Sequence, residues 1–381
     1  MLWQFNLRHL RATAAIARLG SVSAAAQAVS ITQPAITQGL AKLEAQLGVA
    51  LFNRHSDGMS PTAAASLLAP RIERALAHIS NARVTMAQVR ALLALAEAGS
   101  YPAAGVVTGL AQPTLHRAVA DLAVALRRPL VERRGKGIGF TDAGRRVVRN
   151  FRLARAELHA GLTELQRLKG REVGRIAIGA MPLSRARVLP AAVAAFHVRF
   201  PLVRIAILEG AFGDLIEPLR DGEIDMMIGA LRAPSPGADI EQQPLFKDRP
   251  VILGRKGHPL SGSAPDIAKL AEYPWVVPPR GTPLQKQWQS MFDTAGVDLP
   301  LVPIECGSVI TIRQLLITTD FLTLLSPDQV AVELEAGWLE IIADTPPGLS
   351  RTIGISTRTG WQPTALQSEF FDQLKLVVDD A

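Results

Sequence analysis

The stretch SITQPAITQGL at residues 30–40 has a counterpart, GLAQPTLHRAV, at residues 109–119. One constant offset, which places Gly20 on Gly99, superposes the two stretches. From that glycine pair onwards, the same offset aligns further identities without a gap over a whole domain length. Alanine-rich composition alone does not account for matches of that extent. The sequence therefore predicts a tandem duplication in the first half of the chain.

The first copy, SVSAAAQAVSITQPAITQGLAKLEAQLG at residues 21–48, predicts a helix, a short polar turn and a second helix. Ser30 or Thr32 is expected to cap the second helix, and Pro34 is tolerated in its first turn because its missing N–H would be unpaired there. A helix-turn-helix places the start of its second helix at base edges in the DNA major groove. The segment LFNRHSDGMSPTAAA that follows predicts a wing, a β-hairpin carrying Arg54.

The second copy has the same layout and more cationic chemistry. Ala111 stands where Thr32 stood, His116 and Arg117 are added, and the wing is strongly basic. We therefore expect base reading mainly from the first copy and salt-dependent phosphate binding from the second. The candidate DNA-binding residues are Thr32, Gln33, Pro34, Thr37, Gln38, Lys42, Arg54, Gln112, Thr114, His116, Arg117, Arg133, Arg134 and Lys136. Two alternatives stay open: either copy is a helical bundle whose turn only connects helices, or the duplicate is kept for packing alone.

The charge is divided unequally along the chain. Residues 1–171 hold 23 Lys and Arg against 9 Asp and Glu, a balance of +14, whereas the remainder carries −7. A basic half predicts contact with a polyanion, while a solvated basic face without a partner is the alternative that charge alone leaves open.

Length and composition narrow the class of protein further. The 381 residues allow two or three domains, and the single cysteine, Cys306, cannot form an internal disulfide, which fits a reducing cytoplasm. We expect no signal peptide, no transmembrane helix and no membrane partner. The histidines lack metal-ligand spacing and no nucleophile or phosphate-loop motif occurs, so we expect neither an enzyme nor a cofactor or metal.

From Val173 onwards the residue pattern changes to short runs rich in β-branched residues, such as GRIAIGA and VRIAILEG, which alternate with amphipathic segments. This pattern predicts βαβ units and a mostly parallel sheet. Between the halves, residues 145–170 lack proline and predict a long linker helix. Its residues Val148, Phe151, Leu158, Leu162 and Leu165 are available to pack against a partner helix. An ordinary amphipathic helix lying on its own domain is the alternative.

The chain resembles the LysR-type transcriptional regulators of bacteria. The resemblance rests on S-x-S-x-A-A followed by Q-P-A-I-T, L-E-x-x-L-G and L-F-x-R, and on RRPLVERRGKGIGFTDAGRRV in the second copy, and it covers essentially the whole chain. It implies a winged helix-turn-helix, a dimerising linker helix and a two-lobed α/β effector domain like a periplasmic binding protein. Here the winged domain is expected twice. Ala65 stands where the family expects a glycine that the second copy keeps as Gly144, and Arg127 replaces the glycine kept as Gly48.

The expected organisation is multidomain. Two tandem, mainly α winged helix-turn-helix domains occupy residues 1–80 and 81–144, a linker and dimerisation helix residues 145–171, and the effector-binding domain residues 172–381. The segments YPWVVPPRGT and EIDMMIGAL look similar to the branch of sugar-responsive and protocatechuate-pathway regulators.

By the same resemblance, an anionic or sugar-like effector binds between the lobes, at helix starts that favour anions. The residues at matching positions are Ser184, Arg185, Arg280, Thr282 and Ser308. For each serine or threonine, simple helix capping is the alternative. Cys306 beside this crevice is interpreted as a small apolar residue rather than a redox centre.

The expected function is therefore a cytoplasmic, sequence-specific DNA-binding regulator controlled by a small effector. Its expected partners are double-stranded promoter or operator DNA, the effector, and further copies in a homodimer or homotetramer. The alternative is a solute-binding protein whose helical half mediates assembly rather than DNA binding.

Overall fold

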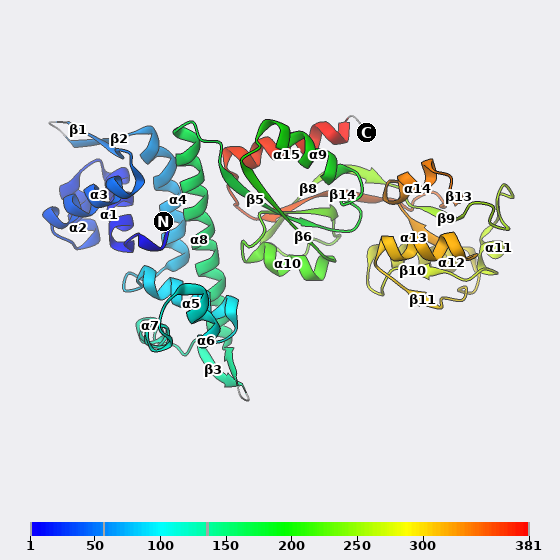
Figure 1. Ribbon diagram of the computed structural model, residues 1–381, viewed down its shortest axis with the longest axis horizontal. Coiled ribbons are helices and arrows are strands. Elements are labelled where there is room, and N and C mark those ends of the chain that lie inside the picture. The colour runs from blue at the N-terminus through cyan, green and yellow to red at the C-terminus, as the bar shows by residue number, and fades with distance from the viewer. Residues whose placement is uncertain (1, 56–57, 135–136, 380–381) are drawn as a thin grey trace. The chain divides into compact units, whose positions relative to one another are not determined.

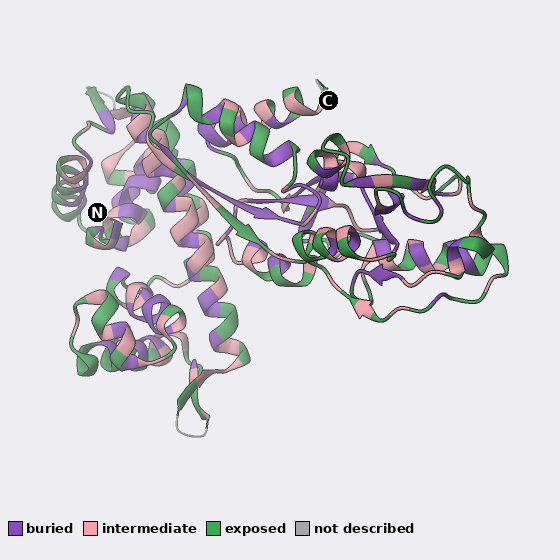
Figure 2. Ribbon diagram, turned by 45° about the vertical axis from the view of Figure 1, so that its right-hand side comes forward, coloured by how far each residue is buried: buried purple, intermediate pink, exposed green. Residues whose placement is uncertain are grey.

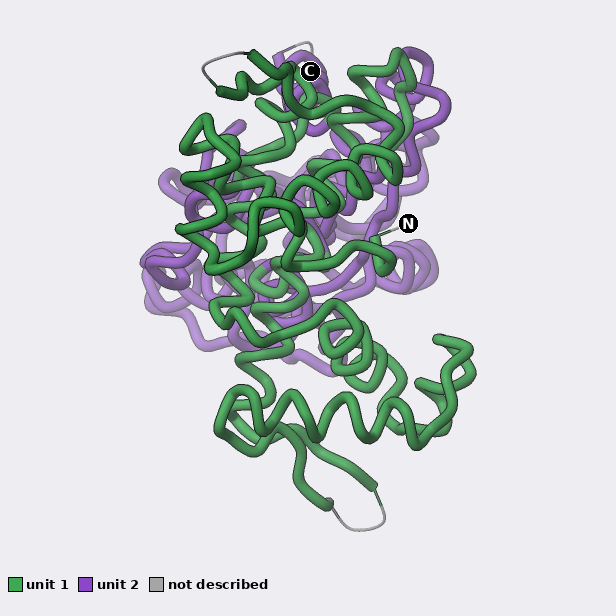
Figure 3. The backbone as a smooth tube through the Cα atoms, turned by 90° about the vertical axis from the view of Figure 1, so that its left-hand side faces the viewer, with its two compact units in different colours: residues 1–174, 220–223, 362–366 green, residues 175–219, 224–361, 367–381 purple. Residues whose placement is uncertain are grey.

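The computed structural model describes residues 2–55, 58–134 and 137–379, and it divides into two compact units (Figure 3). Unit 1 comprises Met1–Gly174 with two short segments, Arg220–Glu223 and Gln362–Leu366. Unit 2 comprises Arg175–Leu219, Ile224–Trp361 and Gln367–Ala381.

Unit 1 begins with a short 3-10 helix, η1 (Leu2–Gln4), which is followed by two sets of elements in the same order. The first set is α1 (Leu7–Leu19), α2 (Val22–Val29), α3 (Gln33–Leu47), β1 (Phe52–His55), β2 (Gly58–Pro61) and α4 (Ala63–Ile79). The second set is α5 (Met86–Ala98), α6 (Tyr101–Thr108), α7 (Gln112–Leu126), β3 (Val131–Arg134), β4 (Gly137–Phe140) and α8 (Asp142–Leu168). Each element from α5 to α8 begins where the offset of the sequence repeat places the start of its counterpart among α1 to α4, and all but α8 also end where it predicts. We call α1–β2 the first module and α5–β4 the second module (Figure 1).

Side-chain caps begin most of these helices at equivalent positions. Ser21 and Ser100 cap α2 and α6, and Thr62 and Thr141 cap α4 and α8, each by accepting a main-chain N–H. The expected caps on α3 are wrong. Thr32 occupies the cap position without a side-chain bond, as Ala111 does before α7, and Ser30 instead ends α2 in the left-handed conformation. The second module, which has Ala111 at the position equivalent to Thr32, therefore lacks no capping hydrogen bond that the first module has.

The ends of α3 and α7 show why a glycine is favoured directly after each of these helices. Gly48 ends α3 with φ 65°, and its N–H bonds to the carbonyl of Glu44. Arg127 adopts the same left-handed conformation after α7, with φ 53°. A residue with a Cβ is strained there by about 1–2 kcal/mol, a cost that glycine avoids.

Helices α4 and α8 pack against each other in antiparallel directions, side by side in Figure 1. Gly161 of α8 lies so close to α4 that a Cβ on it would stand 2.8 Å from Leu68 Cδ1. One carboxylate, that of Glu157, accepts from Arg71 at 3.3 Å and from Arg74 at 3.0 Å. One hydrophobic core runs from α1 through both modules to α8.

This packing corrects the expected linker. The helix starts at Asp142 rather than near residue 145, and α4 of the same chain covers Phe151 and Leu158, the face expected to meet a partner helix. The reason is that the duplication includes the start of the long helix, so the chain contains two copies of it.

The two short segments of unit 1 are held by arginines of this helix pair. Arg149 and Arg152 donate to opposite oxygens of Asp221 at 2.7 and 2.5 Å. Arg71, buried between α4 and α8, donates to the main-chain carbonyls of Gln362 and Pro363 at 2.8 and 3.0 Å. Its guanidinium thus reaches both the Glu157 carboxylate and a loop.

Unit 2 contains a five-stranded sheet of order β6-β5-β7-β14-β8, whose central strands are mostly buried (Figure 2). Its strands are β5 (Gly174–Ala180), β6 (Val203–Glu209), β7 (Met226–Ala230), β8 (Ile240–Asp248) and β14 (Arg351–Arg358), and α9 (Val188–Arg199), α10 (Phe212–Arg220) and α15 (Ala365–Asp379) accompany them. Strands β5 and β7 are parallel, whereas β14 runs antiparallel to both β7 and β8.

A second group of strands lies between β8 and β14 in the sequence. Its strands are β9 (Val251–Arg255), β10 (Val276–Val277), β11 (Ile304–Glu305), β12 (Thr323–Leu325) and β13 (Leu339–Asp344), and its helices are α11 (Ile267–Ala271), α12 (Pro283–Ala295), α13 (Val309–Thr318), η2 (Pro327–Val330) and α14 (Ala331–Glu335). It has its own apolar core around Trp275 and Phe292. The expectation of mostly parallel strands is wrong, because the chain leaves the larger sheet along β8 and returns beside it along β14, and β9 pairs antiparallel with β12 and β13.

Among the described residues, no single helix has the length and apolar composition needed to cross a membrane. The bent pair α5 and α6 passes that test only by its combined length and composition, with a bend of 117°.

Replacing Arg127 by glycine should stabilise the chain, because it removes the left-handed strain at the end of α7 without removing a buried side chain. We expect a gain of about 1 kcal/mol, or roughly 2–4 °C in the melting temperature. Gly48→Ala, the matched control after α3, should lower the melting temperature by a similar amount. Thermal unfolding of the full chain measures both. A fall with Arg127→Gly would contradict the account of this helix end.

Candidate functional site

Helix α3 exposes one polar face at its N-terminal end. It buries Ile36, Leu40 and Leu43 in the core, which leaves the polar positions between them in contact with solvent. Gln33 and Gln38 are exposed. Gln33 Nε2 also donates to Ser23 Oγ of α2 at 2.9 Å, which fixes the amide at the start of the helix. The other candidates of this face, Thr32, Pro34 and Lys42, are exposed, and Thr37 is half-buried.

His9 of α1 supports this face from behind. Its ring lies against Gly39, where a Cβ would stand 2.7 Å from His9 Cδ2. Burial, and to a lesser extent the positive charge of Lys42, lowers the pKa of His9 below its usual value. Both causes favour the neutral form of the ring beneath α3. The sequence analysis gave His9 no role. The feature that identifies this contact is the large ring of His9 packed against Gly39, a residue without a side chain.

Helix α7 exposes the equivalent face with different chemistry. Leu115, Val119 and Leu122 are buried, while Gln112, Thr114, His116 and Arg117 are exposed. The His116 ring packs at 5.2 Å from that of Tyr101 in α6, and Arg117 Nε lies 3.9 Å from a carboxylate oxygen of Asp121. Asp121 is the counterpart of Lys42, so the two faces differ in charge as well as shape.

Each module carries a two-stranded antiparallel hairpin after its third helix, α3 or α7. In the first, Arg54 is exposed and His55 Nε2 bonds with Ser60 Oγ at 2.8 Å. In the second, Arg133 is exposed on β3. The Arg134 side chain and the whole of Lys136 lie outside the described residues.

Unit 2 contains a cavity of about 470 Å³, lined from both groups of strands. Arg185 contributes to it and pairs with Glu209, and Arg280 contributes while lying 3.3 Å from Glu305. Thr282 also lines the cavity, and its hydroxyl accepts from the N–H of Gln285 as the cap of α12. Three of the expected effector residues are thus brought together.

The two expected serines are placed differently. Ser184 is fully buried and donates to the carbonyls of Met181 and Ile228 at 2.9 and 3.1 Å, so it is not among the described cavity-lining residues. It does not begin a helix either, because α9 starts only at Val188. Ser308 caps α13 and is exposed, whereas its neighbours Gly307 and Val309 line the cavity. Cys306 is a lining residue as well.

Two arginines that sequence reasoning missed lie in the same lining. Arg232 stacks its guanidinium 4.5 Å from the centre of the Phe212 ring, and burial lowers its pKa below the ordinary arginine value. Arg351 pairs with buried Asp248 at 2.6 Å. In the part of the chain that the structure describes, Arg232 Nε and Arg351 Nη2 are buried donors without a hydrogen-bond partner. The sequence could have indicated Arg232 by its position, because it follows the end of β7 and ligands of such sheets bind at the ends of strands.

Comparison with known proteins agrees with both halves of the chain. A family model described as the bacterial regulatory helix-turn-helix protein of the lysR family matches residues 7–66 and, again, 86–145. A model described as the LysR substrate binding domain matches residues 169–378. The two helix-turn-helix matches are separated by the same offset as the sequence repeat.

Three known proteins illustrate the likeness. The transcriptional regulator GalR of Pseudomonas putida is 32% identical over 368 residues, with 93% of each chain covered. The transcriptional regulator PcaQ of Agrobacterium fabrum is 25% identical, covering 74% of this chain and 91% of its own. Full-length CbnR, solved in complex with its target DNA, shares the fold with a TM-score of 0.55 and 18% identity, covering 76% of this chain and 98% of its own.

The matches to PcaQ and CbnR leave about a quarter of this chain unmatched, whereas the match to GalR covers 93% of it and so includes residues of both modules. These comparisons do not favour the alternative of a solute-binding protein with an assembly domain. The chain belongs to the LysR family of bacterial transcriptional regulators, DNA-binding proteins that carry a ligand-binding domain.

Proposed function

We propose that both modules are winged helix-turn-helix domains and that α3 and α7 both contact operator DNA. The observation that carries this proposal is that each helix buries its apolar positions and exposes the polar residues of its first turns. Amide and hydroxyl groups at these positions suit base edges, while Lys42, Arg54 and Arg133 suit phosphates. The hairpins are then the wings.

The proposed effector is a small anion, with a carboxylated sugar or aromatic acid as the fitting class. Arg232 and Arg351 are half-buried residues that line the cavity, and each has one buried nitrogen, Arg232 Nε and Arg351 Nη2, without a hydrogen-bond partner among the described residues. A buried donor without a partner is costly, and an anion would satisfy it with a charge-assisted bond. The apolar wall formed by Phe212 and Ile312 would hold a ring.

The two groups of strands in unit 2 are proposed to act as the lobes of a periplasmic-binding-protein-like domain. Arg185 and Arg232 come from one lobe, and Arg280 and Thr282 from the other, so one ligand in the cavity would touch both. Binding there can shift the chain between states only if the ligand contacts the two lobes differently in each. We further propose a cytoplasmic protein that acts as a homodimer or homotetramer.

Neutralising Lys42 should weaken DNA binding and reduce its salt dependence. Each phosphate contact contributes about 0.9 to the slope of log K against log salt, so Lys42→Ala should lower that slope by about one. Gel-shift titrations over several salt concentrations measure this, using full-length protein and duplexes selected by it from a random-sequence pool.

Lys247→Ala, an exposed cation on β8 of unit 2, is the matched control and should leave the slope unchanged. The same slope for wild type and Lys42→Ala would remove α3 from the proposed phosphate contacts. A protein that retains no duplex from the pool at low salt would contradict the DNA-binding proposal itself.

Removing the charge of Arg232 should abolish recognition of anions in the cavity. Aromatic and sugar carboxylates should raise the melting temperature of the wild-type chain, whereas their methyl esters should not. Arg232→Gln should lose this response, because its amide cannot pair with a carboxylate in the same way.

Ser184→Ala serves as the control for that thermal-shift series. It loses only internal hydrogen bonds, so it should melt lower yet keep the carboxylate response. Equal responses to acids and esters would reject an anionic effector.

A further inference from the structure

We propose that a single chain reads two adjacent and unlike half-sites of DNA in a fixed order, because α4 and α8 pair within the chain and hold one recognition helix at each end. The inference rests on the proposed DNA-binding function and goes beyond it. It states how many half-sites one chain occupies, and it requires them to differ.

The paired faces of α4 and α8 are equivalent positions of the repeat. Leu68, Ile72, Ala75 and Ile79 in α4 correspond, at the offset of the repeat, to Val147, Phe151, Ala154 and Leu158 in α8. All eight side chains are buried, and all belong to the core of unit 1. The apolar face of α4 therefore packs against the equivalent face of α8 within one chain, as identical faces of two subunits do at a two-fold interface.

The register of the pair supports this two-fold relation. Glu157 lies between Arg71 and Arg74, and Gly161 lies over Leu68 and Arg71. Continuing this antiparallel register one turn further along each helix brings Ala75 level with Ala154. These two alanines are equivalent residues. Equivalent residues meet only at the symmetry point of such a pair.

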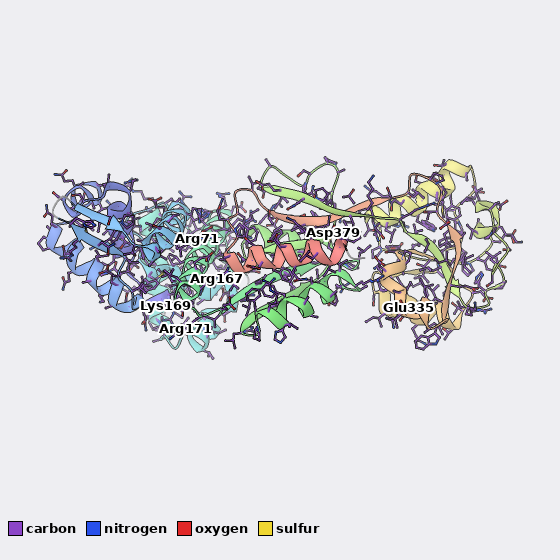
Figure 4. The ribbon with its side chains drawn as sticks, turned by 90° about the horizontal axis from the view of Figure 1, so that it is seen from above. Arg71, Arg167, Lys169, Arg171, Glu335 and Asp379 are labelled. Carbon is purple, nitrogen blue, oxygen red and sulfur yellow. The ribbon has the colours of Figure 1, made fainter. Side chains whose placement is uncertain are left out.

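The ends of the pair are tied to the opposite modules. Lys169 Nζ, just after α8, donates to the carbonyl of Leu47 at the end of α3, at 2.5 Å. Figure 4 views this end of α8 and labels Lys169. Asn81 Nδ2, just after α4, donates to the carbonyl of Ala125 near the end of α7, at 3.2 Å. Each long helix thus contacts the last turn of the other module's recognition helix.

The length of α8 sets the distance between the two modules. Each module joins the N-terminus of its own long helix, and these N-termini lie at opposite ends of the antiparallel pair. With Leu68 level with Gly161, the N-terminus of α4 lies near the last turn of α8. The junctions of the two modules with their long helices are then separated by most of α8, roughly 36 Å at 1.5 Å per residue. One turn of DNA is about 34–36 Å, so two half-sites one turn apart fit this spacing.

The two recognition faces predict different half-sites. Gln38 and Lys42 on α3 correspond to Arg117 and Asp121 on α7. A Gln amide pairs with adenine, whereas an Arg guanidinium pairs with guanine. A carboxylate repels phosphate where the first module has an ammonium. One chain is therefore expected to prefer a non-palindromic pair of half-sites in one orientation. A further copy of the chain would associate through another surface and add another such pair.

The test is a selection from a random-sequence duplex pool by full-length protein, Gln38→Ala and Arg117→Ala. Both side chains are exposed, so unchanged melting temperatures control for folding. We expect the selected sequence to contain two unlike blocks one turn apart. Gln38→Ala should lose preference in one block only, and Arg117→Ala in the other only.

A second arm reverses the order of the two blocks on an otherwise unchanged duplex, which should weaken binding at least tenfold. Changes by both variants in the same block, equal binding to both orders, or a palindrome of identical blocks would overturn the inference while leaving DNA binding intact. No selected sequence at all would instead overturn the proposed function.

Discussion

The antiparallel packing of α4 on α8 is the contact on which unit 1 depends. It buries the same apolar stripe twice, places the Glu157 carboxylate between Arg71 and Arg74, and uses Gly161 for close approach. Removing one partner of such a buried ion pair would leave an uncompensated charge and destabilise the packed helices. The pairing joins the two modules in one hydrophobic core.

The repeat explains most of what the sequence could predict. Because one offset aligned the whole first half, the order of helices and hairpins could be predicted from either copy. The exposed positions of α3 and α7 followed as well. The left-handed Arg127 was visible in the sequence as a departure from Gly48. The apolar stripe on α8 was also visible in the sequence, but the helix that covers it is α4 of the same chain, as in the alternative of a helix lying on its own domain.

What the sequence could not supply was the identity of partners that meet only through tertiary structure. The stripe on α8 has the same pattern whether another copy or α4 covers it. Ser184 looked like a helix cap beside a ligand, yet its hydroxyl bonds to the carbonyl of Met181, just after β5, and to that of Ile228 in β7. Arg232 and Arg351 are far apart in sequence, and only the return of β14 beside β7 brings both to the cavity. The mixed direction of that sheet was hidden for the same reason.

The central claim is that one chain brings two different recognition helices to DNA. A hydroxyl-radical footprint on the selected duplex, at one chain per duplex, tests it most directly. The account predicts two protected patches about one helical turn apart that appear together as protein is added. A single protected patch, or a second patch that appears only when a second chain binds, would contradict it.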